Sequence, residues 1–274
     1  MSVNSHSANL QNLFKLYSRH YQLTWEMIKR DITDRYAGQM FGSAWAIGHP
    51  LFLMAIYTVV FSFIFSLRLK GQADFTLDYT TYLLSGLIPW MVFQESMNRG
   101  TTAILANADL VKQVVFPLEI LPVKGIFSSF LTQIVGTLFL MGYVIIKFSY
   151  LPWTYSLLPL LFLFQLLAMM GVSFMLAAVG AYFRDLKEVV QVFGIAGLYI
   201  IPVFYLPEWL PSWCQPLLYL NPFSHMVWCF QDACYFGRLA HPWSWVIFFS
   251  LSFLTFYVGY RIFNRLKTMF GNFL

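Results

Sequence analysis

The stretch YTTYLLSGLIPWMVFQ, residues 79–94, holds 16 residues without a formal charge and is interrupted by a proline. A helix that crosses a bilayer alone needs about 20 predominantly apolar residues, so this stretch is short for a span. It reaches that length only if the helix continues through ESMNRGTTAIL, which brings Glu95 and Arg99 to the membrane or its edge. These two residues lie four apart with the acid first, the favourable order for a helical ion pair. We predict a span over residues 79–105 that carries a Glu95–Arg99 pair.

The composition of the whole chain indicates a membrane protein. Of its 274 residues, 59% are hydrophobic and 11% are charged, whereas soluble globular domains carry about 25% charged residues. Lipid offers no hydrogen-bond partner to the backbone, so long apolar runs in a membrane form helices. We expect an all-α membrane protein, a single domain over residues 1–274, whose other spans cover residues 42–67, 124–147, 156–182, 189–206 and 242–262.

The distribution of lysine and arginine predicts the topology. Basic residues collect in cytoplasmic loops, and with six spans thirteen of them fall on one side of the membrane and four on the other. Both termini are therefore expected in the cytoplasm, and this bias accounts for the net charge of +5 without a nucleic-acid partner. The thirteen are Lys15, Arg19, Lys29, Arg30, Arg35, Arg99, Lys112, Lys124, Arg184, Lys187, Arg261, Arg265 and Lys267; the four are Arg68, Lys70, Lys147 and Arg238.

The connection between the fifth and sixth spans, residues 207–240, is rich in proline and aromatic residues. Its first half, PEWLPSWCQPLLYLNP, is too broken by proline to form one spanning helix. Irregular backbone at membrane depth survives only when it is buried in protein or lines a cavity. We predict a re-entrant gate segment on the outer face, with Trp209 and Trp213 at the level of the lipid headgroups. The alternative is an interfacial belt of aromatic residues without a gating role.

A helical stripe near the N-terminus predicts an amphipathic interface helix over residues 10–37. Apolar and aromatic residues recur there at spacings of three and four, while charged residues such as Lys29 and Arg30 lie off the stripe. Such a helix can lie in the inner headgroup layer or dock a cytosolic partner. The stripe consists of Leu10, Phe14, Tyr17, Tyr21, Trp25, Ile28, Ile32 and Tyr36.

The sequence carries no recognisable motif for catalysis or nucleotide binding. It contains no HExxH, paired-carboxylate or nucleophile motif and no GxxxxGK[ST] loop. Cys214, Cys229 and Cys234 form no metal or redox spacing, and we interpret them as small apolar residues rather than as a disulfide. Apart from Glu95 and Arg99 the interiors of the spans are uncharged, whereas ion-coupled transporters carry ionisable groups in mid-span. We expect a passive conduit without catalytic, cofactor or metal sites, driven by a separate subunit.

Five short motifs, in this order, carry a resemblance to a known family. They are RDITDRYAGQMFGSAWAIGHP before the first span, GLIPWMVFQES in the second, NADLVKQVVFPLEILP in the next inner loop, YFRDL after the fourth span and YLNP before the last. Together they resemble the ABC-2 family of exporter permeases, in particular the membrane subunits that export O-antigen, capsule or teichoic-acid polymers. One departure is His49, where many relatives have asparagine before the proline.

The resemblance implies a transport subunit, not an enzyme, in the bacterial inner membrane. Its implied partners are membrane lipid, a second copy of the chain, two cytosolic ATPase subunits that bind ATP and Mg²⁺, and an exported polysaccharide that is expected to be lipid-linked. The alternatives are export of a drug, lipid or peptide by the same architecture, or a membrane-embedded acyl- or glycosyltransferase. The implied ATPase-coupling residues are Trp25, Lys29, Arg30, Asp109, Lys112, Glu119, Arg184 and Asp185. The implied outer gate contains Pro207, Trp209, Pro211, Trp213, Asn221 and Pro222.

Overall fold

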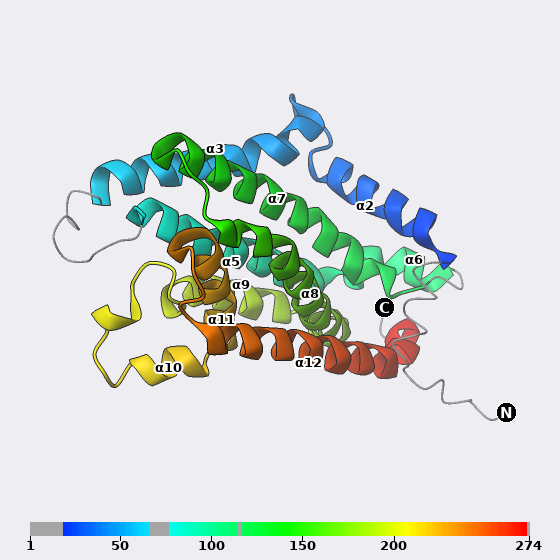
Figure 1. Cartoon of the computed structure of the whole chain (residues 1–274). Coiled ribbons are helices and arrows are strands. Elements are labelled where there is room, and N and C mark those ends of the chain that lie inside the picture. The colour runs from blue at the N-terminus through cyan, green and yellow to red at the C-terminus, as the bar shows by residue number, and fades with distance from the viewer. Residues whose placement is uncertain (1–18, 66–76, 114–116, 273–274) are drawn as a thin grey trace.

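The computed structural model describes residues 19–65, 77–113 and 117–272, and all regular structure within these ranges is helical, as predicted (Figure 1). The first part of the expected interface helix, residues 10–18, lies outside the described residues, as do Arg68 and Lys70. The main helices are α2 (Tyr21–Arg35), α3 (Trp45–Val59), α5 (Tyr79–Thr102), α6 (Ala108–Gln113), α7 (Ile120–Phe148), α8 (Leu158–Gly180), α9 (Leu186–Ile200), α10 (Gln215–Leu220), α11 (Pro222–Gln231) and α12 (Pro242–Leu266).

Short helical turns complete the fold. Two are π-helical: η2 (Val60–Phe65) continues α3, and η6 (Asp232–Phe236) continues α11. The others are the 3-10 segments η1 (Gly42–Ala44), η3 (Leu105–Asn107), η4 (Trp153–Leu157), η5 (Pro207–Trp209) and η7 (Lys267–Asn272).

Four helical stretches among the described residues are long and apolar enough to cross a membrane: Gly42–Ser62, Ile120–Phe148, Trp153–Gly180 and Pro242–Phe270. α5 and α9, which correspond to the other two expected spans, are not among them. The expected span over residues 189–206 is shorter than predicted, because α9 has 15 residues and ends at Ile200. Ile201 precedes a proline and takes an extended conformation, which a proline favours in the residue before it.

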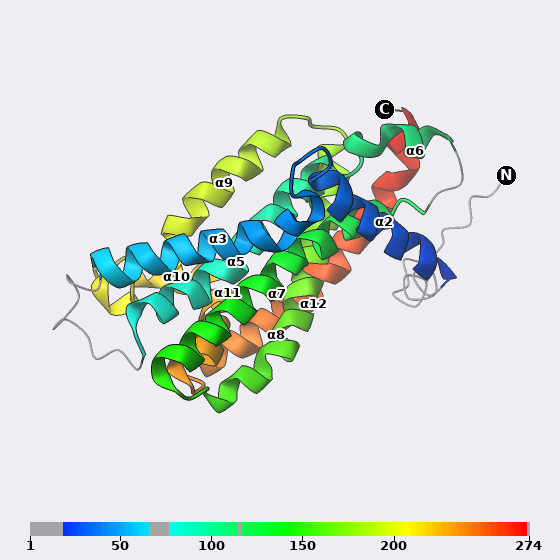
Figure 2. The same cartoon turned by 90° about the horizontal axis from the view of Figure 1, so that it is seen from above.

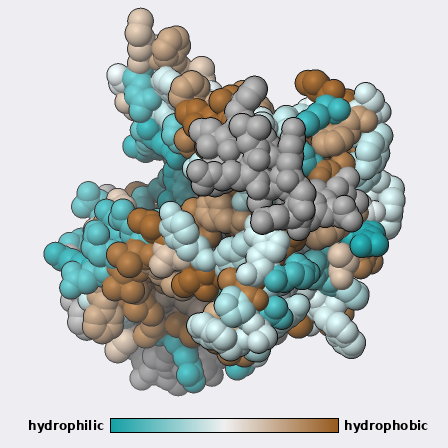
Figure 3. Space-filling model, turned by 90° about the vertical axis from the view of Figure 1, so that its left-hand side faces the viewer, coloured by the Kyte–Doolittle hydropathy of each residue, from teal (hydrophilic) through white to brown (hydrophobic). Residues whose placement is uncertain are grey.

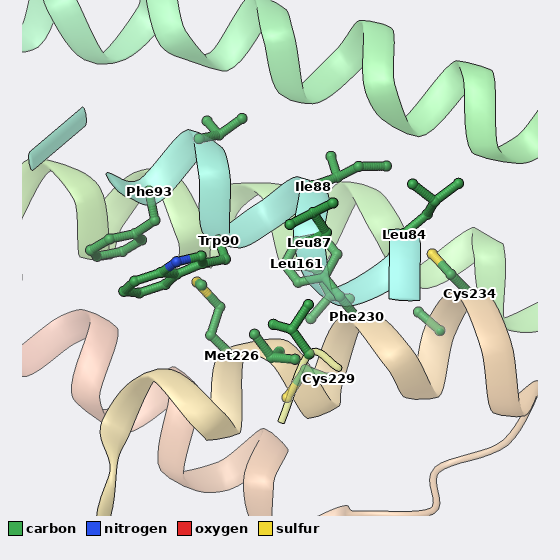
Figure 4. Packing of buried hydrophobic residues seen from close by; sticks show 14 of the residues in the cluster. Leu84, Leu87, Ile88, Trp90, Phe93, Leu161, Met226, Cys229, Phe230 and Cys234 are labelled. Atoms are coloured by element: carbon green, nitrogen blue, oxygen red, sulfur yellow. The ribbon is translucent and has the colours of Figure 1, made fainter. Parts of the chain in front are cut away.

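α5 lies at the centre of the bundle, although its sequence is the least apolar of the expected spans. In two perpendicular views it runs between α7 and α9 (Figures 1 and 2), and it also packs against α3, α8 and α11. Trp90 and Leu87 of α5 lie close to Met226 and Phe230 of α11 (Figure 4). Protein rather than lipid surrounds most of this helix, so its burial does not depend on a continuous apolar run.

Glycine sets the spacing between α8 and α12. A Cβ atom added to Gly259 of α12 would lie 2.0 Å from the carbonyl oxygen of Gly171 in α8. The obstructing atom belongs to the backbone and cannot rotate away, so the two helices touch at a point that admits no side chain. Small residues at such crossings let membrane helices approach closely.

The two ends of the bundle differ in what they carry (Figure 1). One end, called here the α6 end, carries α2, α6 and the C-terminal end of α12. The opposite end, called the α10 end, carries η5 and α10. α5 extends between them, so its first turns lie towards the α10 end and its last turns towards the α6 end.

Candidate functional site

The ion pair expected between Glu95 and Arg99 is present, with Arg99 Nε 3.2 Å from Glu95 Oε1. Both residues also reach α2. Arg99 Nη1 lies 2.6 Å from Asp31 Oδ2, and Arg35 Nη1 lies 2.6 Å from Glu95 Oε1. The four side chains are between 17% and 29% exposed, so water screens these pairs less than it screens a surface pair. We call Asp31, Arg35, Glu95 and Arg99 the charge cluster.

Lys124 of α7 lies beside the charge cluster. Its Nζ lies 2.9 Å from Asn107 Oδ1 and 3.9 Å from Asp31 Oδ1. The charge cluster therefore lies where α2, α5 and α7 meet, at the α6 end of the bundle.

The partners Asp31 and Arg35 were not identified by sequence analysis, although the sequence contains a signal for them. Asp31 and Arg35 lie four residues apart with the acid first, as do Glu95 and Arg99. When two such helices run antiparallel, each acid of one lies beside the base of the other. The two i,i+4 pairs are therefore complementary across the contact between α2 and α5.

The predicted stripe coincides only in part with the face of α2 that packs on the bundle. Of its members, Ile28 and Tyr36 are buried, whereas Tyr21 and Trp25 are exposed. Thr24, which lies off the stripe, is buried as well. The charge cluster turns Asp31 and Arg35 towards α5, and Thr24 and Ile28 lie on that same face at helical spacing. The exposed aromatic residues instead border an apolar cavity of about 330 Å³ lined by Tyr21, Thr24, Trp25, Ile28, Val123, Phe127 and Met170.

The other α2 residues expected to couple to an ATPase, Lys29 and Arg30, are exposed. Lys29 Nζ lies 3.0 Å from Glu26 Oε1, and Arg30 Nε lies 3.3 Å from Asp34 Oδ2. Exposed pairs of this kind add little stability. Their charges therefore remain accessible on the surface of α2.

The remaining coupling candidates lie at the α6 end, but they differ in exposure. Asp109 and Lys112 are exposed on α6, and Arg184 and Asp185 are exposed in the turn between α8 and α9. Glu119 is only 3% exposed, and its Oε1 lies 2.5 Å from Lys267 Nζ in η7. The structure thus places the first four residues where a partner can reach them and turns Glu119 into the protein.

At the α10 end the chain stays irregular after α9. We call residues 201–206 the unwound segment. Its backbone carbonyls accept hydrogen bonds from side chains of α5 and α11. The donors are Tyr82 Oη (to Tyr205 O at 2.9 Å and Pro202 O at 3.2 Å), Tyr79 Oη (to Phe204 O at 2.6 Å) and Gln231 Nε2 (to Pro202 O at 2.8 Å).

The predicted outer gate residues follow the unwound segment. Pro207 and Trp209 lie in η5, and Pro211 and Trp213 lie in the turn before α10, with Trp213 72% exposed. Asn221 and Pro222 start α11: Asn221 Oδ1 accepts from the Phe223 backbone N–H at 3.0 Å, and proline suits the first helical position. Figure 3 shows hydrophilic and hydrophobic residues intermixed over this end of the molecule.

A buried carboxylate joins the outer connection to the last helix. Asp232 is fully buried, and its oxygens lie 2.8 Å from His241 Nδ1, 2.9 Å from the His241 backbone N–H and 3.0 Å from Trp245 Nε1. The imidazole of His241 stacks on Trp228, with ring centroids 5.3 Å apart. This arrangement fixes the start of α12 against α11 and η6.

The three cysteines carry no disulfide. Cys229 and Cys234 are buried in the apolar core between α5 and α11–η6 (Figure 4). Free cysteine behaves there as a small hydrophobic residue.

Comparison with known proteins places the chain in a family. The sequence pattern of ABC-2 type transporters matches residues 22–235. The chain is 28% identical to the "O-antigen export system permease protein RfbA" of Klebsiella pneumoniae, over 93% of this chain and 95% of that protein. It is 25% identical to the protein of the same name from Myxococcus xanthus, over 94% and 99%, and 24% identical to the "Polysialic acid transport protein KpsM" of Escherichia coli, over 86% and 90%. Because the family pattern covers most of its length, the chain belongs to the ABC-2 type transporter family.

Proposed function

We propose that this chain is the permease subunit of an ATP-driven exporter that moves a lipid-linked polysaccharide from the cytoplasm across the bacterial inner membrane. The observation that carries the proposal is its similarity, over nearly the whole length of both chains, to proteins named for O-antigen export and polysialic acid transport. Full-length similarity favours a shared transport role over a domain borrowed for another purpose. Polysaccharide that accumulates inside cells lacking this chain would support the substrate class, and an accumulating drug, lipid or peptide would contradict it.

The proposed topology has six spans, with the α6 end in the cytoplasm. The exposed charges of α6 and of the Arg184–Asp185 turn lie at that end, in agreement with the positive-inside bias. α5 crosses inside the bundle. α9 is about 22 Å long, so the unwound segment completes its crossing, and side-chain donors to its carbonyls are what irregular backbone at membrane depth requires.

Single cysteines in a cysteine-free background test this topology. Cysteine at Ser149 is expected to react with an impermeant thiol reagent added outside the cell, whereas cysteine at Ala108 or Lys187 is expected to be protected until the membrane is opened. Labelling of either position from outside in intact cells would contradict the six-span topology.

The proposed assembly is a homodimer bound to two cytosolic ATPase subunits, which hold ATP and Mg²⁺. The ATPase would dock on α2, α6 and the Arg184–Asp185 turn. The outer segment, residues 207–240, would act as the gate. The exposed charged side chains of α2, α6 and the Arg184–Asp185 turn support the docking role, and the exposed tryptophans of residues 207–240 support the gating role.

Two variants separate docking from gating. Lys112→Glu is expected to weaken co-purification of the ATPase and to leave polymer inside the cell. Trp209→Ala combined with Trp213→Ala is expected to keep the ATPase bound while surface glycan staining changes. The proposal fails if the tryptophan variant loses the ATPase while Lys112→Glu keeps both docking and export.

A further inference from the structure

α5 makes contacts of two kinds at its two ends. Towards the α6 end, Glu95 and Arg99 pair with charges of α2. Towards the α10 end, the hydroxyls of Tyr79 and Tyr82 hold carbonyls of the unwound segment. One helix therefore touches both the element proposed to meet the ATPase and the segment that leads directly into the proposed gate.

We propose that α5 transmits displacement of α2 to the unwound segment, and that the charge cluster and the two tyrosines are positioning residues for transport. The proposal rests on the proposed function, because it needs an ATPase that moves α2. It adds a mechanical role for residues that the functional site leaves unassigned, namely Asp31, Arg35, Glu95, Arg99, Tyr79 and Tyr82.

The charge cluster is suited to be the input because it fixes one register between α2 and α5. α2 packs along α7 and reaches α5 through these charged side chains. Sliding α2 by one turn would place Asp31 opposite Glu95, so that like charges would meet at a partly buried site. Displacement of α2 is therefore resisted within the cluster and passed on to α5.

The contact between α5 and α9 ties the two helices together. α9 presents Gly194 and Gly197 to Gln94 and Trp90 of α5, and a Cβ at either glycine would lie 2.4 Å from those side chains. Gln94 and Trp90 therefore fill notches in the surface of α9. A shift of α5 is passed to α9, which ends at Ile200 where the unwound segment begins.

The tyrosine contacts are suited to be the output because they act on backbone that is not helical. Tyr82 Oη lies 2.9 Å from Tyr205 O and 3.2 Å from Pro202 O. The hydroxyl has a single proton, so it donates fully to one of these carbonyls at a time, and Gln231 Nε2 also donates to Pro202 O. A shift of α5 thus changes which carbonyls are held, and the unwound segment follows.

The test measures how ATP changes the outer segment in the complex of this chain with its ATPase. The reporter is Ser212→Cys with Cys214→Ala, labelled by an impermeant thiol reagent with the ATPase either free or holding a non-hydrolysable ATP analogue. Two variants break the proposed link: Arg99→Gln removes the partner of Asp31, and Tyr82→Phe removes one hydroxyl. Two matched controls lie outside it: Arg261→Gln, at an exposed position of α12, and Tyr155→Phe, which removes a buried hydroxyl that donates to Cys234 O.

The nucleotide-dependent change in labelling rate is expected to fall at least fivefold in Arg99→Gln and in Tyr82→Phe, with the ATPase still co-purifying, and to persist in both controls. The proposal is overturned if either variant keeps the full change, if both controls lose it as well, or if Arg99→Gln acts by releasing the ATPase. Should Arg99→Gln not fold, Tyr82→Phe decides the result. If the reporter ignores nucleotide in the complex without these substitutions, the inference is overturned, whereas a chain that binds no ATPase at all would contradict the proposed function.

Discussion

The contacts that α5 makes with α2 and with the unwound segment differ in their chemistry. At the α6 end the contacts are ion pairs, in which Asp31, Arg35, Glu95 and Arg99 alternate in sign. At the α10 end the contacts from Tyr79 and Tyr82 are neutral hydrogen bonds to backbone carbonyls. An ion pair acts over several ångströms and therefore favours one alignment of α2 along α5. A tyrosine hydroxyl affects only the carbonyl to which it donates a hydrogen bond.

The difference follows from the surroundings of each end. The charge cluster keeps 17–29% of its side-chain surface exposed, so its charges do not bear the full cost of desolvation. The unwound segment lies against buried residues of α5 and α11, and its carbonyls need donors from the protein. Tyrosine meets that need because its ring packs with apolar neighbours while its hydroxyl donates.

Asp232 is an exception to this comparison, because it is a buried acidic residue within the outer connection, residues 207–240. Asp232→Ala would remove the acceptor of three N–H groups, and we expect a loss of unfolding free energy of about 3–5 kcal/mol, because a buried donor left without an acceptor costs about 1–3 kcal/mol. Thermal unfolding of the detergent-solubilised chain measures it. Asp232→Asn keeps an acceptor and serves as the control. A loss under about 1 kcal/mol for Asp232→Ala would show that these donors find other acceptors.

A double variant tests how strongly the residues of the charge cluster interact. Glu95→Gln alone deprives Arg35 of its partner, and we expect a loss of about 2 kcal/mol of unfolding free energy, because the site is partly exposed. Glu95→Gln with Arg99→Gln leaves Asp31 and Arg35, which can pair with each other four residues apart on α2. The double variant is therefore expected to be more stable than the single one in chemical denaturation, and raised salt should reduce the difference. Additive losses would mean that Glu95 and Arg99 do not interact.

The tyrosine contacts are expected to give a smaller effect without salt dependence. Tyr82→Phe removes the donor to Pro202 O and Tyr205 O, and we expect a loss of about 1–2 kcal/mol, since the buried carbonyls lose a neutral hydrogen bond. The measurement is unfolding at low and high salt. A salt-dependent loss as large as that of Glu95→Gln would remove the distinction between the two ends.

The sequence predicted the helical class and the Glu95–Arg99 pair, because apolar runs and i,i+4 spacing are local properties. It predicted less well where the tertiary surroundings decide. α9 ends six residues before the predicted limit at residue 206, because Ile201 and Pro202 start an irregular segment whose carbonyls are held by distant tyrosines.

The same limit applied to the candidate site: features set by local sequence were predictable, and those set by tertiary contacts were not. The exposed positions of Asp109, Lys112, Arg184 and Asp185 follow from polar residues in short connections. The burial of Glu119 does not, because Lys267 lies 148 positions later in the chain. The partners Asp31 and Arg35 required a comparison between two helices rather than the periodicity of one.

The smallest expected effect concerns pH at the start of α5. Asp78 caps this helix through Thr81, and Tyr143 and Lys147 of α7 donate to its Oδ2 at 2.6 Å each. Burial alone would raise the pKa of Asp78, but the hydrogen bonds from Lys147, Thr81 and Tyr143 outweigh it and leave the pKa below its ordinary value of 3.8.

A carboxyl group with a lowered pKa stabilises the folded chain only while it is ionised. The contribution of Asp78 is therefore fully present above about pH 4 and is lost as the pH falls through the lowered pKa of the folded state. Asp78→Asn keeps a helix cap but loses the hydrogen bonds that Lys147 and Tyr143 donate to the carboxylate. We therefore expect it to be less stable than the unaltered chain at pH 7 by roughly 1 kcal/mol, and the difference should shrink in acid. Melting temperatures of both chains in detergent at pH 7 and near pH 3 provide the measurement. A difference that grows in acid would mean that Asp78 is held protonated and that burial dominates its surroundings.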